Sequence, residues 1–182
     1  MRALQVLALA GSLRAASMNR LMLAMAAECA PVGMKIDIFD GLGDFPLFNP
    51  DLEAPGCVEP ASVARLRLAI AGADAVLIAS PEYAHGVSGV MKNALDWMVA
   101  NGVFVGKPVV LWNASPRASI ALAALRETLS VMTADLVREA ELCLLIQGRD
   151  GLLPSNPDPL AMQQALLKLK ARLCEQAAAS LL

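Results

Sequence analysis

The sequence lacks several features that mark large classes of proteins. It has 15 lysines and arginines against 17 acidic residues, a formal net charge of −2 and no basic run. Nucleic acids and anionic membranes bind through clustered positive charge, so we expect neither as a partner. The longest stretch without a charged residue, 3–13, has 11 residues. A transmembrane helix needs roughly 18, so we predict no membrane span.

The N-terminus has some features of a secretory signal peptide. Arg2 precedes an apolar run that ends in Ala8-Leu9-Ala10 before Gly11. The run is only about eight residues long and contains Gln5, and its removal would delete the first predicted strand. We therefore expect a cytoplasmic protein.

Cysteine and histidine are also scarce. The cysteines at positions 29, 57, 143 and 174 form no C-x-x-C pair, and His85 is the single histidine. We therefore predict no metal site, and we expect the cysteines to be buried free thiols in a reducing compartment.

Apolar residues, by contrast, are abundant. Hydrophobic residues make up 57% of the 182 positions, above the usual 45–50%. One domain of this length buries a sizeable core without disulfides or metals. We predict a single domain, 1–182, in which either nearly every element is buried or one face is covered by another subunit, and therefore a homo-oligomer.

Strand and helix patterns alternate along the chain. Short apolar runs without alternation predict strands that are covered on both faces, whereas 35–39 alternates and predicts an edge strand. The predicted strands are 6–10, 35–39, 75–79, 109–112 and 142–146. The predicted helices are 17–30, 60–71, 89–101, 119–132 and 159 to the C-terminus.

This alternation predicts an α/β doubly wound fold built from right-handed βαβ units. Five strands fit the flavodoxin-like order 2-1-3-4-5, with helices on both faces of a parallel sheet. In that order the first and third strands are neighbours whose connections leave in opposite directions, and ligands bind outside their carboxyl ends. The Gly- and Pro-rich stretch 40–60 is either a functional loop or a surface excursion.

The loop after the first strand, 11–20, is rich in groups that suit a phosphate. The Ser12 and Ser17 hydroxyls, the Asn19 amide, the Arg14 guanidinium and the amides that open a helix together match a phosphate monoester. The loop is neither G-x-G-x-x-G nor a Walker loop. Alternatively, Ser17 is an ordinary N-cap and Arg14 a solvated side chain.

The loop after the third strand, 80–89, suits a flat ligand. Pro81 stiffens the turn, Tyr83 offers an aromatic face or edge, and small residues follow at 86, 88 and 89. The alternative is a plain turn. We expect His85 to face solvent, because no carboxylate lies near it in sequence. The apolar stripe in 90–97 predicts packing or a subunit contact.

Two motifs carry a family resemblance. Gly-Ser-Leu-Arg with Ser-x-Asn-Arg occupies 11–20, and Ser-Pro-Glu-Tyr continues to Gly-x-x-Lys-Asn-Ala-x-Asp-Trp in 80–97. Together they resemble the NADPH-dependent FMN reductase family, which includes chromate, quinone and azo reductases. The resemblance implies a flavodoxin-like fold, non-covalent FMN, NADPH or NADH as electron donor, and a homodimer or homotetramer.

The resemblance also implies a set of cofactor-binding residues. It assigns a phosphate loop, a segment at the flavin ring edge and part of the loop after the fourth strand. The residues are Ser12, Arg14, Ser17, Met18, Asn19, Pro81, Glu82, Tyr83, Ala84, Ser115 and Pro116. None is predicted to be catalytic, because the cofactor carries the chemistry.

Two departures from the family pattern stand out. Many members have Asn-Gly-Ser after the tyrosine, where this chain has Ala84-His85-Gly86, and a Gly-Gly turn where this chain has 113–119. They bear on acceptor choice and ring contacts more than on FMN itself.

The predicted function is NAD(P)H-dependent reduction of a flavin, quinone or similar small acceptor. One alternative is an FMN-bearing electron carrier, although a net charge of −2 does not suggest its acidic docking surface. Another is a non-flavin phosphate or sugar-phosphate binder on the same scaffold.

Overall fold

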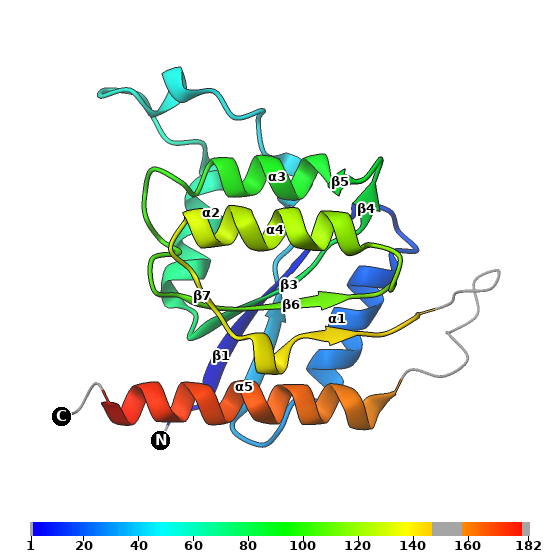
Figure 1. Cartoon of the computed structure of the whole chain (residues 1–182). Helices are drawn as coiled ribbons and strands as arrows, with labels where there is room; N and C mark the ends of the chain where they lie inside the picture. The colour runs from blue at the N-terminus through cyan, green and yellow to red at the C-terminus, as the bar shows by residue number, and fades with distance from the viewer. Residues whose placement is uncertain (1, 147–157, 180–182) are drawn as a thin grey trace.

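The computed structural model describes residues 2–146 and 158–179 of the chain. A parallel sheet lies between two helical layers (Figure 1). The sheet strands are β1 (Leu4–Ala10), β2 (Met34–Ile38), β3 (Ala75–Ala79), β6 (Pro108–Asn113), β7 (Asp135–Leu136) and β8 (Leu142–Cys143). The helices are α1 (Met18–Glu28), α2 (Ala61–Gly72), α3 (Gly89–Asp96), α4 (Ser119–Val131) and α5 (Pro159–Ala179).

The strand order is β2-β1-β3-β6-β7, with β8 also paired to β6, so the predicted order 2-1-3-4-5 is confirmed. The central strands pair in parallel, with Val6 opposite Ala75 and Val76 opposite Val109. The alternating segment β2 is an edge strand, as predicted. Three short helical turns complete the fold: η1 (Leu42–Asp44), η2 (Pro50–Glu53) and η3 (Arg138–Ala140).

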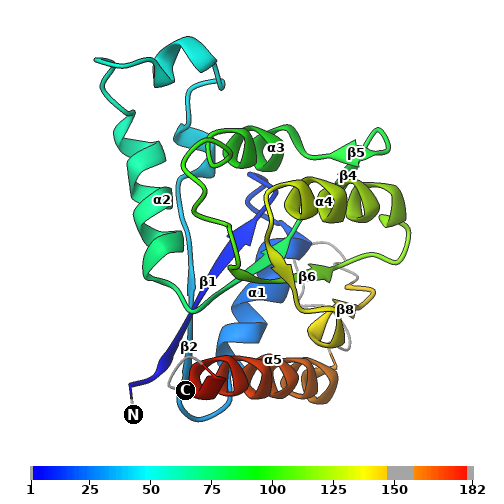
Figure 2. The same cartoon turned by 60° about the vertical axis from the view of Figure 1, so that its left-hand side comes forward.

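Alternate residues of each central strand feed two separate cores. The first core packs the sheet against α1 and α5, and the second packs it against α2, α3 and α4, on the opposite side (Figure 2). In β1, Val6, Ala8 and Ala10 belong to the first core, and Leu7 and Leu9 to the second. Burial on both faces explains why these strands show no polar alternation in sequence.

Several expectations need correction. The fifth strand position is divided between two short strands. Residues 135–136 pair with one end of β6, and after η3 only 142–143 of the predicted 142–146 forms a strand, which also pairs with β6. Helix 89–101 ends at Asp96 and continues as turns. The cysteines are free, but none is fully buried as expected: Cys29 is half-buried, and those at 57, 143 and 174 are exposed.

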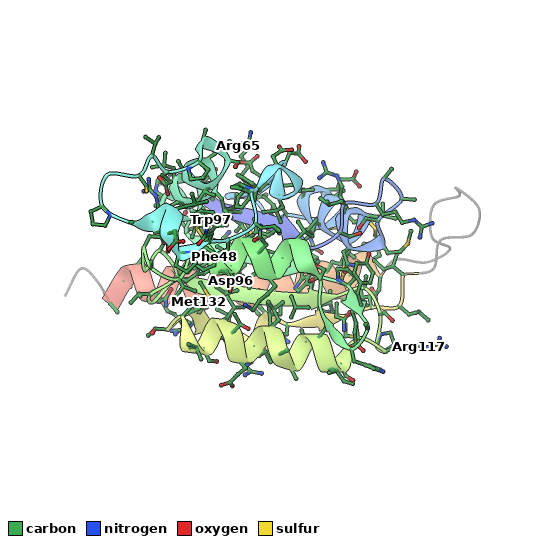
Figure 3. The ribbon with its side chains drawn as sticks, turned by 90° about the horizontal axis from the view of Figure 1, so that it is seen from above. Phe48, Arg65, Asp96, Trp97, Arg117 and Met132 are labelled. Carbon is green, nitrogen blue, oxygen red and sulfur yellow. The ribbon has the colours of Figure 1, made fainter. Side chains whose placement is uncertain are left out.

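Trp97 lies inside its own chain. It is 1% exposed, donates a hydrogen bond to the Pro46 carbonyl oxygen and packs edge-to-face against Phe48, 5.2 Å between ring centroids (Figure 3). The packing interpretation of the 90–97 stripe therefore holds at Trp97 and Ala94, which are both buried. Oligomerisation stays a prediction, without support from Trp97.

Part of the stretch 40–60 is anchored to α3 and the residue that follows it. Pro46 accepts hydrogen bonds from Trp97 and Asn93, while residues such as Leu47 and Val58 are exposed. No helix within 2–146 or 158–179 has the length and apolar character that crossing a bilayer requires.

Gly11 follows β1 and packs closely against Ser80, which follows β3. Its amide donates to the Ala79 carbonyl oxygen at 2.8 Å, and an added Cβ would lie 2.3 Å from Ser80 Oγ and 2.7 Å from Ser80 Cβ. Rotation of the Ser80 hydroxyl cannot move Ser80 Cβ, so a side chain at position 11 would force the strand ends apart.

We therefore expect Gly11→Ala to lower the free energy of unfolding by about 1–3 kcal/mol, measured by urea denaturation. Gly72→Ala is the matched control, because nothing lies within 4 Å of its added Cβ at the end of α2. The control should be neutral or stabilise by up to about 1 kcal/mol. Equal behaviour of the two variants would contradict the close-approach argument.

Candidate functional site

A cavity of about 500 Å³ lies at the carboxyl ends of β1, β3 and β6. This is where the strand order reverses, the position that the sequence predicted for a ligand. Three loops line it, together with two residues that follow β8. The lining residues are Ser12, Arg14, Ala16, Ser17, Met18, Asn19, Pro81, Glu82, Tyr83, His85, Asn113, Ala114, Ser115, Arg117, Ala118, Leu145 and Ile146.

The first loop presents the N-terminus of α1 to the cavity. Ser17 is the N-cap, and its Oγ accepts a hydrogen bond from the Arg20 amide at 3.2 Å. The amides of Met18 and Asn19 open the helix and have no partner within it. Both residues line the cavity, where the positive end of the helix dipole favours an anion.

Asn19 carries an unsatisfied buried polar atom. Its side-chain Oδ1 is buried and has no hydrogen-bond partner within the described residues, and the residue is 7% exposed. A buried amide oxygen without a partner costs roughly 1–3 kcal/mol, so such groups are rare in folded proteins. Because Asn19 lines the cavity, a ligand hydroxyl or amide group is the natural partner for it.

The second loop is a short hairpin, β4 (Glu82–Tyr83) paired with β5 (Gly86–Val87). The two residues at its tip both have positive φ, 48° at Ala84 and 59° at His85. Two-residue hairpins of this kind prefer Asn-Gly, which tolerates left-handed backbone. Ala84 and His85 therefore adopt a left-handed turn conformation that residues with a side chain of their kind disfavour.

Glu82 joins this hairpin to α4. Its Oε2 accepts hydrogen bonds from the amides of Ile120 and Ala121, each at 2.9 Å, in the first turn of the helix. Its Oε1 lies 3.0 Å from His85 Nδ1. The Ala121 amide bond is the largest cause that lowers the pKa of Glu82, and His85 and the Ile120 amide add to it. The Glu82 carboxylate thus caps a helix and is held in its charged form.

His85 faces solvent as predicted, with 78% of its side chain exposed. The statement that no carboxylate lies near it in sequence was wrong, because Glu82 is three residues away and hydrogen-bonds to it. Nearby, the Tyr83 hydroxyl lies 3.4 Å from Ser12 Oγ. This contact joins the first and second loops across the cavity.

The third loop is held by a buried amide. Asn113 is 4% exposed, its Nδ2 donates to the Ala118 carbonyl oxygen and its Oδ1 accepts from the Ser115 amide. Ser115 Oγ in turn accepts from the Arg117 amide at 3.3 Å. These bonds fix the backbone of 113–118 and leave the Arg117 side chain exposed.

Two arginines of the cavity lack an acidic partner among the described residues. Of the nine arginines in the described residues, seven lie within 4.0 Å of a carboxylate oxygen. The two without such a partner there, Arg14 and Arg117, both line the cavity. Glu82 is the one acidic residue in the lining, and its charge already faces the α4 amides. The cavity therefore favours anionic ligands.

Of the residues predicted from sequence, the structure brings nine together around the cavity: Ser12, Arg14, Ser17, Met18, Asn19, Pro81, Glu82, Tyr83 and Ser115. Ala84 and Pro116 do not line it, and both are exposed, whereas their chain neighbours His85 and Arg117 do line it. Sequence reasoning missed Asn113 and Arg117 as site residues, although both lie in a loop that it had placed at the crevice. It also missed Leu145 and Ile146, which arrive from beyond β8.

Comparison with known proteins identifies the family. The family model for NADPH-dependent FMN reductase matches residues 4–144. The chain belongs to this family. The match ends just beyond β8 and includes all three loops of the cavity.

Curated relatives match a shorter segment of the chain. It is 41% identical over 114 residues to an NAD(P)H-dependent FMN reductase of Pseudomonas aeruginosa, and 36% identical over 114 residues to a quinone reductase of Escherichia coli K12. Each match covers 62% of this chain and 60% of the relative. The match thus spans about three fifths of the length of these relatives.

Solved structures match nearly the whole chain. A flavoenzyme NAD(P)H:acceptor oxidoreductase from Paracoccus denitrificans superimposes with a TM-score of 0.71 at 27% identity, covering 97% of this chain and 94% of the other. An oxidised flavodoxin from Bacillus cereus matches with a TM-score of 0.57 at 14% identity, covering 95% and 98%. The second likeness concerns the fold alone and establishes it as flavodoxin-like.

The role of Glu82 generates a pH-dependent prediction. We expect Glu82→Gln to lower the midpoint of thermal unfolding at neutral pH by roughly 2–4 °C, because it removes the negative charge at the α4 N-terminus. The folded-state pKa is lowered, so this stabilisation is present above the unfolded pKa of glutamate and is lost as pH falls through the folded value.

The difference between wild type and Glu82→Gln should therefore shrink as the pH is lowered through the carboxyl range in calorimetric scans. Glu127→Gln, on the exposed side of the same helix, changes the net charge equally and is the matched control. A difference that is the same at every pH, or equal in the control, would contradict the charge-capping role.

Proposed function

We propose that this protein binds FMN in the cavity at the β1–β3 crevice and uses NAD(P)H to reduce a small acceptor such as a quinone. Family membership supports the flavin and the donor. The named relatives, an FMN reductase and a quinone reductase, support the acceptor class.

The observation that carries the proposal is the pairing of an anion site with an unsatisfied buried amide in one cavity. The helix amides at Met18 and Asn19, the Ser12 hydroxyl and the Arg14 guanidinium suit a phosphate monoester. Asn19 Oδ1 needs a donor beside that phosphate site. FMN offers both groups, because a phosphate and a hydroxylated ribityl chain are adjacent in the molecule.

The residues present fit the rest of the cofactor. The flat ring would lie between the second and third loops, beside Pro81, Tyr83 and Ser115, where the cavity is open to a second ligand. The backbone of these loops is held by two side chains that are already bonded within the fold: Glu82 to the amides of α4, and Asn113 to the backbone of its own loop. A rigid wall of this kind orients a flat ligand without the use of any charged side chain on the ring.

The side chains of the cavity bind and orient rather than react. Bound FMN would supply the acceptance and donation of a hydride equivalent. Glu82 is committed to the α4 amides and is held ionised, so it is not a proton donor. Tyr83 is exposed and its hydroxyl is directed to Ser12, which places it at the entrance where donor and acceptor would alternate.

The first prediction of this proposal concerns Arg14. We expect Arg14→Ala to weaken FMN binding about 10- to 150-fold in calorimetric titration, because it removes a charge-assisted hydrogen bond to the phosphate. Changes at Ser12 or Ser17 should act in the same direction with a smaller loss, since a neutral hydroxyl forms a weaker bond.

Riboflavin is the control ligand, because it has the ring and the ribityl chain without the phosphate. Its weaker binding should be nearly the same in wild type and Arg14→Ala. Equal losses for both ligands would indicate a damaged fold, and no loss for either would remove Arg14 from the site. An electron carrier would bind FMN equally well but would not be bleached by NADPH at a catalytic rate.

The second prediction concerns Asn19. We expect Asn19→Ala to leave the stability of the FMN-free protein unchanged or higher, because it removes a buried oxygen that lacks a partner. The affinity for both FMN and riboflavin should fall, because the two ligands share the ribityl chain. A variant that unfolds more easily without FMN yet binds it normally would show that Asn19 serves the fold and not the ligand.

A further inference from the structure

Besides Arg14, the cavity has a second arginine without an acidic partner among the described residues, Arg117, whereas the proposed cofactor FMN carries a single phosphate. On the proposed function, the FMN phosphate lies at the α1 N-terminus beside Arg14, on the opposite side of the strand-order reversal from the loop after β6. No carboxylate of the described residues lies within 4.0 Å of Arg117, and the one acidic lining residue faces the α4 amides. Arg117 is therefore available to an anionic group of a second ligand.

Hydrogen bonds within the loop 113–118, which carries Arg117, fix its backbone. The buried Asn113 amide bonds to Ser115 on one side and Ala118 on the other, and Ser115 Oγ accepts from the Arg117 amide. Only the side chain then loses freedom when it meets a ligand, which lowers the entropic cost of binding. No hydrogen bond or ion pair within 2–146 and 158–179 uses the guanidinium, so its removal should leave the loop intact.

The position of the side chain indicates which part of a ligand it would meet. Arg117 extends beyond the N-terminal end of α4 at the edge of the molecule (Figure 3). A guanidinium at the rim is suited to a group that projects out of the cavity, not to the ring inside it. Nicotinamide dinucleotides have this form, because their phosphates lie far from the reacting nicotinamide.

We propose that Arg117 binds a phosphate of the dinucleotide electron donor and sets the affinity of the protein for that donor. The inference rests on the proposed function, and it assigns a role to this chain's own third loop, where many members of the family have a Gly-Gly turn. Two phosphates of the donor qualify: the pyrophosphate, which NADP⁺ and NAD⁺ share, and the 2′-phosphate, which only NADP⁺ carries.

The test is equilibrium binding of NADP⁺ and NAD⁺ to the FMN-loaded protein, measured by calorimetry, so that no turnover is needed. We expect Arg117→Ala to raise the dissociation constant of NADP⁺ about five- to thirtyfold at low salt, with less change at high salt. Arg117→Lys should recover part of this loss, because it keeps the charge but not the planar fork. Lys168→Ala, on the exposed face of α5, removes one positive charge elsewhere and is the control.

An equal loss for NADP⁺ and NAD⁺ assigns Arg117 to the pyrophosphate, and a loss for NADP⁺ alone assigns it to the 2′-phosphate. Both results support the proposal. Binding of both nucleotides that matches the Lys168→Ala control would overturn it, as would a parallel loss of FMN affinity, which would place Arg117 in the flavin site. Failure of the wild-type protein to bind FMN or either nucleotide would instead refute the proposed function.

Discussion

The close approach of β1 and β3 at their carboxyl ends is the constraint on which the site depends. Gly11 and Ser80 meet there with no room for a Cβ on Gly11, and the Gly11 amide is bonded to Ala79. The first loop leads into α1. The second loop leads into α3, and its hairpin is bonded through Glu82 to the first turn of α4. The cavity opens between them because the strand order reverses at this pair.

Polar side chains divide into two groups around that cavity. Asn113 bonds to backbone groups of its own loop, and Glu82 bonds to backbone amides of α4, so each fixes a loop. Asn19 has a buried oxygen with no partner in the described residues. The satisfied groups hold the loops in place, and the unsatisfied oxygen is the one that the proposed ligand would complete.

The arginines also divide into two groups, those with an acidic partner and those without one. Most arginines are paired with carboxylates on the surface, where such pairs hold side chains in place but add little stability. Arg14 and Arg117, on two different loops of one cavity, have no such partner in the part of the chain that the structure describes. A protein whose net charge is close to zero thus has a locally positive site, which its overall composition does not reveal.

The sequence alone determined the sheet order, the two-sided burial of the central strands and the presence of candidate anion-binding groups in the first loop. These features depend on local patterns: apolar runs of strand length, helix-capping residues and the Gly11–Arg20 motif. Tertiary structure alone decided the rest, because it depends on contacts between residues far apart in the chain. The bond of Glu82 to the α4 amides, the split fifth strand, the entry of Leu145 and Ile146 into the cavity and the burial of Trp97 against Phe48 are all of this kind. No local pattern encodes whether an arginine meets a carboxylate, so only the folded chain shows that Arg14 and Arg117 have no acidic partner among the described residues and lie on two loops of one cavity.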